Sequence, residues 1–165
     1  MSVSKDLTNA FRSSMEQMHN DMDISFRVMV LGANAWPLNP PGHEFVIPAE
    51  IVPTYVQFQQ YYEIKHINRR LTWLWNYSEN ELRTNYTNQK YILVTSTYQM
   101  AVLVQYNKSD TLSVEELAAA TGVPRKLLVQ VLGLLVKAKI LINEVSEQYD
   151  LNARMFIQFA FLFIH

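Results

Sequence analysis

Cysteine is absent from the 165-residue chain, and glycine occurs only four times. Without cysteine, disulfide bonds, thiolate zinc sites and cysteine nucleophiles are excluded. The glycines lack the spacing of a loop that cradles phosphate, and no two histidines have the helical zinc-protease spacing with a glutamate between them. Carboxylates are numerous, but nothing in the sequence pairs two of them as acid and base. We therefore expect no catalytic residue, metal or cofactor, and we favour a binding or scaffold role.

Charged residues are also few. They make up 18% of the chain, below the roughly 25% typical of soluble domains, and the formal net charge is -1. This balance gives no overall attraction towards nucleic acids or other polyanions. Hydrophobic residues make up 49%, which is enough for a sizeable core in one domain or two tightly packed subdomains. The low charge has two interpretations: a partner covers part of an apolar surface, or the core is large.

The first part of the chain changes from helical to strand periodicity. One face of a helix predicted from Ser4 to about Asn20 carries Leu7, Phe11, Met15 and Met18. Ile24–Leu31 then alternates between apolar and other residues, which predicts a half-buried strand. The apolar face of that strand consists of Ile24, Phe26, Val28 and Val30. No basic segment followed by an apolar run opens the chain, so no secretory signal is evident and an intracellular protein is expected.

A proline-rich loop separates this strand from the next helix. Trp36 lies in the loop, and we favour a core position for it over a partner-facing one, because large aromatic residues beside a strand are usually buried. A helix is predicted from Pro48, a favoured first residue, to about His66. Its aromatic face is typical of a core and consists of Ile51, Tyr55, Phe58 and Tyr62, widened by Val52 and Val56.

Three short β-favouring runs follow, separated by polar turn residues. They are Leu71–Trp75, Glu81–Tyr86 and Tyr91–Thr95. In the first run, Leu71, Trp73 and Trp75 share one face of the predicted strand. Thr97 is placed to cap an apolar helix that follows, Tyr98–Tyr106. These runs predict a small, mostly antiparallel sheet that leads into a buried helix.

The second half has clear helix boundaries. They are a capping box at Ser113 and Glu116, a stop signal at Gly122 and a start at Pro124. The helix that begins there is predicted over Arg125–Ala138. Ile140–Glu144 and Gln148–Leu151 are predicted to form a β-ribbon. This order of helices followed by a ribbon is that of a winged helix.

The chain ends in an apolar run, Met155–Ile164, that contains one polar residue. A helix that spans a membrane takes about twenty residues, so the run is too short and no membrane association is expected. The run favours β-structure and carries no charge, which makes it prone to aggregation where it is exposed.

Several motifs, in order, give the chain a family resemblance. S-V-S-K-D-L opens it, A-W-P-L lies in the proline-rich loop, and R-R-L-T-W-L-W and S-T-Y-Q-M-A-V-L-V-Q-Y-N lie in the middle. These motifs resemble the cullin homology region, most closely that of SCF-type cullins, over roughly Ser2–Leu151. Two features depart from the family: Ile67-Asn68 stand before Arg69-Arg70 where the family usually has Ser-Gly, and the chain leaves the pattern after Asn152.

Cullins are scaffolds of multisubunit RING-type ubiquitin ligases. The resemblance implies that a sheet in this chain accepts the N-terminal strand of a RING-box protein, and that catalysis belongs to a ubiquitin-conjugating enzyme bound through it. Such a scaffold supports ubiquitin-dependent protein degradation, and its expected location is the cytoplasm and nucleus. An open sheet edge suits this role, because an added strand satisfies its N–H and C=O groups. The candidate partner-binding residues are Ile24, Phe26, Val28, Val30, Trp36, Leu71, Trp73, Trp75, Ile92 and Val94. In the alternative interpretation, the tryptophans fill the core.

We predict an α+β fold with four parts. Residues 1–22 end a helical bundle, 23–97 form the sheet subdomain with a packed helix, 98–151 form a winged helix, and 152–165 are a tail outside the family pattern. A DNA-binding winged helix is the alternative function. It is disfavoured because few side chains of Arg125–Ala138 could reach a groove: Arg125, Lys126, Gln130 and Lys137.

Overall fold

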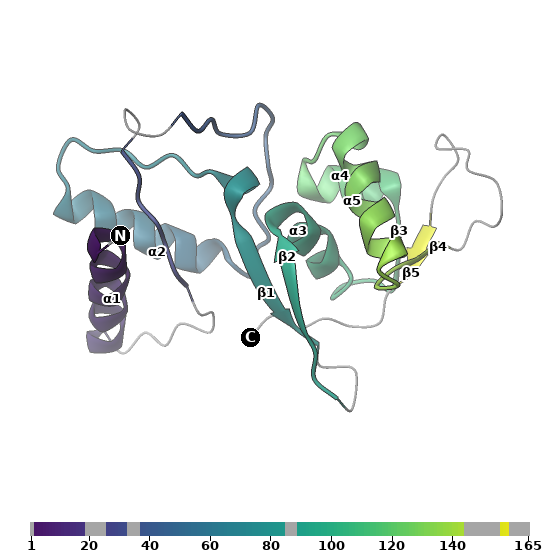
Figure 1. The fold of residues 1–165 in the computed structure, drawn as a ribbon, viewed down its shortest axis with the longest axis horizontal. Helices are drawn as coiled ribbons and strands as arrows, with labels where there is room; N and C mark the ends of the chain where they lie inside the picture. The colour runs from purple at the N-terminus through teal and green to yellow at the C-terminus, as the bar shows by residue number, and fades with distance from the viewer. Residues whose placement is uncertain (1, 19–25, 33–36, 85–88, 144–155, 159–165) are drawn as a thin grey trace. The chain divides into compact units, whose positions relative to one another are not determined.

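The computed structural model describes residues 2–18, 26–32, 37–84, 89–143 and 156–158 (Figure 1). It divides into two compact units. The first unit comprises Met1–Asn39 and Ala49–Trp73, and the second comprises Pro40–Pro48 and Leu74–His165. Helices and antiparallel strands are both present, which confirms the predicted α+β class.

The first unit is built on two helices, α1 (Ser2–Gln17) and α2 (Val52–Lys65). The predicted apolar face of α1 is confirmed at Phe11 and Met15, which are buried, whereas Met18 lies beyond the helix and is 68% exposed. Phe11 packs edge-on against Phe58 of α2, with 5.2 Å between ring centroids. Aromatic pairs in this geometry add to the free energy gained by burying their area.

The structure describes the part of the predicted strand Ile24–Leu31 that begins at Phe26. This part forms no ladder with another described strand, so the prediction of a paired strand is wrong here, but the predicted alternation of buried and exposed side chains is confirmed. Phe26 is buried and Val28 and Val30 are half-buried, while the residues between them are exposed. Thr8 of α1 bonds Val28 through one hydroxyl, donating to the carbonyl oxygen at 3.1 Å and accepting from the N–H at 3.4 Å. A side chain of α1 therefore takes the place of a neighbouring strand along this edge.

Helix α2 begins later than the proline signal predicts. Pro48 and the turn after it precede the helix, and Pro53 occupies its first turn. A helix that started at Pro48 would place Pro53 in its interior, where the ring clashes with a carbonyl and one hydrogen bond is lost. The aromatic face is confirmed as core at Ile51, Phe58 and Tyr62. Val52 and Val56 do not widen it, since both are exposed.

The second unit opens with a short 3-10 turn, η1 (Trp75–Tyr77), and a hairpin of β1 (Glu79–Arg83) and β2 (Ile92–Ser96). The strands are antiparallel, with Leu82 opposite Leu93. The predicted strand Leu71–Trp75 is not part of a ladder in the described structure, and the chain turns at Trp75. The described sheet is therefore smaller than the sequence predicts.

Helix α3 (Thr97–Gln105) follows β2 directly. Its N-cap is Ser96, whose hydroxyl accepts from Gln99 N–H in a capping box, and not Thr97 as predicted. Thr97 instead joins the helix to β1, because its hydroxyl donates to Ser78 O at 3.3 Å and accepts from Asn80 Nδ2 at 3.1 Å.

The rest of the second unit comprises β3 (Thr111–Ser113), α4 (Val114–Thr121), α5 (Arg125–Lys137), β4 (Ile142–Asn143) and β5 (Phe156–Gln158). The capping box at Ser113 and the stop at Gly122 are confirmed. The three strands form an antiparallel sheet in the order β3-β5-β4. The predicted ribbon strand Gln148–Leu151 lies outside the described residues, and the described partner of β4 is β5. The winged helix stays a prediction.

No single helix in the described ranges is long and apolar enough to cross a membrane. Helices α4 and α5 meet that criterion only when they are counted together, and a bend of 114° separates them.

Candidate functional site

The pKa shifts of Tyr55, Tyr106 and Glu116 have structural causes, namely burial and a helix cap. No group of three or more His, Cys, Asp or Glu side chains that could hold a metal ion occurs among the described residues. Burial raises the pKa of Tyr55 to about 12 and raises the pKa of Tyr106 further. Hydrogen bonds from the Ser113 N–H and hydroxyl lower the pKa of Glu116, as its role in a helix cap requires.

Five of the predicted partner-binding residues come together in the first unit, where they pack on the aromatic core: Phe26, Val28, Val30, Leu71 and Trp73. The Trp73 ring lies 4.8 Å from that of Tyr55 and 6.0 Å from that of Phe58, measured between centroids. Phe26 is 7% exposed, and the other four are only partly buried. The cluster is thus mainly a core, with one side that reaches the surface.

Trp75 does not share a face with Trp73, contrary to the sequence prediction. It is 8% exposed and belongs to the second unit, where its ring lies 5.8 Å from that of Phe45. The turn η1 changes the direction of the chain at this point, so strand alternation ends before Trp75. For Trp75, the core interpretation is the correct one.

Ile92 and Val94 lie on the outward face of the β1–β2 hairpin. Their side chains are 58% and 69% exposed, and the residues opposite them in the register are Arg83 and Glu81. The inward face holds the buried side chains of Leu82 and Thr95. This hairpin has two strands in the described structure, and it presents apolar side chains to solvent between charged ones.

The two remaining predicted residues, Ile24 and Trp36, lie outside the described residues. Two other exposed apolar residues, Ile64 and Ile67, are not among the residues predicted from the sequence; they are 79% and 82% exposed. A signal was available for Ile64, which falls off the aromatic face of α2 that carries Phe58 and Tyr62, whereas Ile67 lies beyond the end of that helix.

The basic residues of α5 give no continuous cationic face. Arg125 Nη1 lies 2.9 Å from Glu115 Oε1 of α4, so one of the few cations on this helix is already paired. Leu128, Val131, Leu132 and Leu135 of the same helix are buried. No observation in the described structure therefore favours the DNA-binding alternative.

Comparison with known proteins places these features in a family. Residues 30–161 match the family model described as the cullin alpha+beta domain. The chain is 39% identical over 145 residues to cullin-1 of Schizosaccharomyces pombe and 38% identical over 148 residues to cullin-1 of Dictyostelium discoideum. These alignments cover 86% and 87% of this chain.

A more distant relative is cullin-3A of Arabidopsis thaliana, 32% identical over 125 residues, which cover 75% of this chain and 17% of the relative. The chain spans 19% of the length of either cullin-1 relative. The family-model match includes β5, which lies in the segment that the motif-based resemblance leaves out. The extent of the match, together with the α+β architecture, shows that the chain belongs to the cullin family.

Proposed function

We propose that this chain is a non-catalytic scaffold segment of a cullin–RING ubiquitin ligase that docks a RING-box protein by strand addition. Membership of the cullin family supports the scaffold role. The chemistry of ubiquitin transfer would belong to a conjugating enzyme held by the RING-box protein, and the complex would serve ubiquitin-dependent degradation in the cytoplasm and nucleus. This chain would contribute backbone and apolar contacts.

The segment from Phe26 to Val30 carries the proposal. In extended backbone, the N–H and C=O of one residue lie on the same edge, and those of the next residue lie on the opposite edge. Both backbone groups of Val28 bond Thr8, and Phe26 O accepts from Arg12 Nη2 at 3.2 Å, so this edge faces α1. Within the described residues, the backbone groups of Arg27 and Met29 have no hydrogen-bond partner.

A strand added along the Arg27 and Met29 edge would satisfy these groups without disturbing α1. The half-buried side chains of Val28, Val30, Leu71 and Trp73 border the same core and would supply apolar contacts. The β1–β2 hairpin and Leu71–Trp73 are the other segments that could accept the strand. The hairpin already has one ladder along each of its strands, so strand addition there would extend a formed sheet.

Hydrogen exchange tests where the strand adds. The N-terminal peptide of a RING-box protein is expected to slow the exchange of the amides of Arg27 and Met29. Slower exchange confined to Leu71–Trp73 or to Ile92–Ser96 would move the docking edge to those segments. Protection only in α5 would show that strand addition is wrong.

Proline substitution gives a second test. Met29→Pro removes an N–H donor from the outer edge and is expected to abolish capture of a co-expressed RING-box protein. Met29→Ser keeps the donor and should retain capture. Circular dichroism checks that both variants are folded. If the folded wild-type chain captures no RING-box protein, and a fusion to the preceding helical bundle of a cullin relative also fails, the scaffold proposal is wrong.

A further inference from the structure

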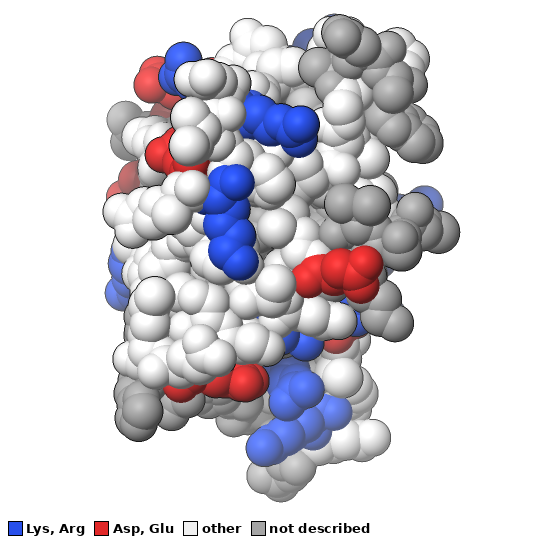
Figure 2. Space-filling model, turned by 90° about the vertical axis from the view of Figure 1, so that its left-hand side faces the viewer, with Lys and Arg blue, Asp and Glu red and all other residues white. Residues whose placement is uncertain are grey.

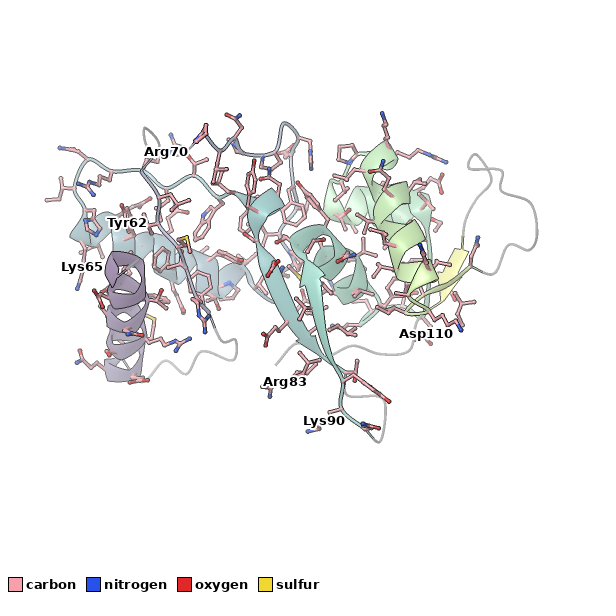
Figure 3. The ribbon with its side chains drawn as sticks, in the orientation of Figure 1. Tyr62, Lys65, Arg70, Arg83, Lys90 and Asp110 are labelled. Carbon is pink, nitrogen blue, oxygen red and sulfur yellow. The ribbon has the colours of Figure 1, made fainter. Side chains whose placement is uncertain are left out.

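The C-terminal end of α2 and the turn after it expose the two most solvent-accessible large apolar side chains of the described structure, Ile64 and Ile67. A backbone bond from His66 N–H to Tyr62 O ends the helix, and a bond from Arg69 N–H to His66 O closes the next turn, at 2.9 and 3.1 Å. Figure 3 labels Tyr62, Lys65 and Arg70 in this part of the chain. Ile67 occupies the second position of the closed turn, so its side chain projects from the tip.

The turn has a defined conformation. Asn68 has φ 65, in the left-handed region that favours glycine and, after it, asparagine. The His66 ring lies 4.4 Å from the Tyr62 ring, which is part of the buried core. Ile67 and Asn68 are also the pair at which the sequence departs from the Ser-Gly of the family resemblance. The exposed isoleucine is thus held in place, at a position that distinguishes this chain.

Three cations lie close to the isoleucines in the sequence. Lys65, Arg69 and Arg70 are exposed, and residues 64–78 contain no aspartate or glutamate. None of the three forms an ion pair with any described residue. Lys65 Nζ lies 4.8 Å from the Tyr61 ring centroid, a cation–π contact that does not neutralise its charge. Figure 2 shows Lys and Arg side chains on this side of the molecule, with Asp and Glu side chains on the same face.

The acid nearest in sequence is Glu63. Its side chain accepts from Gln59 Nε2 at 3.0 Å, which directs it along the helix towards the preceding turn. The segment from Ile64 to Arg70 therefore has positive charge beside exposed aliphatic surface. Two adjacent arginines suit carboxylates, because each guanidinium offers paired N–H donors in the geometry that a carboxylate accepts.

We propose that Ile64, Lys65, Ile67, Arg69 and Arg70 form a docking surface for an acidic peptide segment that carries aliphatic side chains. Nucleic acid is a poorer fit, because the surface offers isoleucines where single strands need aromatic stacking. A lipid surface is also a poorer fit, since two isoleucines and three cations give shallow insertion and about 1 kcal/mol per cation. This proposal does not depend on RING-box docking.

Fluorescence anisotropy with the full chain tests the proposal. The probe is a short labelled peptide rich in glutamate that contains leucines, and its control has glutamine in place of glutamate. The double variant Arg69→Gln, Arg70→Gln is expected to weaken binding about tenfold, as the loss of two exposed charge pairs of roughly 0.7 kcal/mol each predicts. Ile64→Ser with Ile67→Ser should weaken binding of the leucine-containing probe, and not that of a polyglutamate peptide.

Matched variants in the second unit control for net charge. Lys126→Gln with Lys139→Gln removes the same charge from other exposed positions and should leave the affinity unchanged. The proposal is overturned if this control weakens binding as much as the arginine variant does, or if the glutamine peptide binds equally well. It is also overturned if the chain binds phosphatidylserine vesicles and not the peptide. Circular dichroism verifies that each variant is folded.

Discussion

Trp73 and Trp75 have different environments although one residue separates them. Trp73 packs edge-on against Tyr55 and remains half-buried, while Trp75 is almost fully buried beside Phe45. The Trp73 side chain can therefore serve both the core of the first unit and a partner, whereas Trp75 serves the core of the second unit. The contribution of each tryptophan to stability should differ accordingly.

Truncation of each tryptophan measures this difference. Trp75→Ala is expected to lower the free energy of unfolding by about 3–5 kcal/mol, the usual cost for a buried aromatic side chain. Trp73→Ala should cost less, about 2–3 kcal/mol, because part of its surface stays in water. Urea denaturation followed by circular dichroism gives both values. A loss below about 1 kcal/mol for Trp73 would show that it contributes little to the core.

At the scale of the elements, the end of α4 has a strict local requirement for glycine. Gly122 has φ 66, and a Cβ atom there would lie 2.6 Å from Glu44 O. An L-residue in the left-handed region already costs roughly 1–2 kcal/mol, and the contact with a backbone oxygen adds to that cost. The close approach of residues 44–46, where Val46 N–H donates to Thr121 O at 3.0 Å, therefore depends on glycine.

Two glycine substitutions test this requirement against a matched control. Gly122→Ala is expected to lower the free energy of unfolding by at least about 2 kcal/mol, since strain and the contact act together. Gly133→Ala, in the interior of α5 with open space around it, should raise stability by about 0.5–1 kcal/mol. Equal effects of the two changes in thermal denaturation would contradict the close approach at Gly122.

The capping box of α4 predicts a pH dependence. Glu116 Oε2 accepts from Ser113 N–H at 2.7 Å and from the Ser113 hydroxyl at 2.8 Å, which lowers its pKa in the folded chain. The stabilisation is fully present above the ordinary glutamate pKa and is lost as pH falls through the lower, folded value. Glu116→Gln should be less stable than wild type at neutral pH, and the gap should close in acid. If urea denaturation at a series of pH values gave a constant difference in free energy of unfolding between the two proteins, the role of Glu116 in the cap would be contradicted.

At the scale of the whole molecule, charge is sparse and nearly balanced. The formal net charge is -1, and Arg125 on α5 is paired with Glu115. The cations that remain near the end of α2 accompany isoleucines and not aromatic side chains. A general affinity for polyanions is therefore not expected, even though local binding of an acidic peptide is.

Duplex DNA provides the corresponding test. Random duplex DNA should not be retarded by the chain in a gel-shift assay at about 0.15 M salt, because few phosphates could be neutralised. A clear shift whose affinity falls linearly with the logarithm of salt concentration would contradict this expectation. It would also return the DNA-binding winged helix to consideration.

Local features of the fold could be predicted from the sequence alone. The amphipathic face of α1, the aromatic face of α2, the capping box at Ser113 and the stop at Gly122 all involve residues within a few positions of each other. Helix periodicity and caps depend on neighbours in the chain, so their physical causes are contained in a short stretch of sequence.

The tertiary structure decided which extended segments pair. Alternation at Phe26–Val30 predicted the buried face, but only the folded chain showed that Thr8 occupies one edge of that segment. Likewise, β4 pairs with Phe156–Gln158, and Leu71–Trp75 divides between two cores. The backbone hydrogen-bond partners of an extended segment come from distant parts of the chain. The alternation of apolar and polar side chains along the segment is the same whichever partner pairs with its edge. Local pattern therefore determines the face of a strand, while packing determines its neighbour.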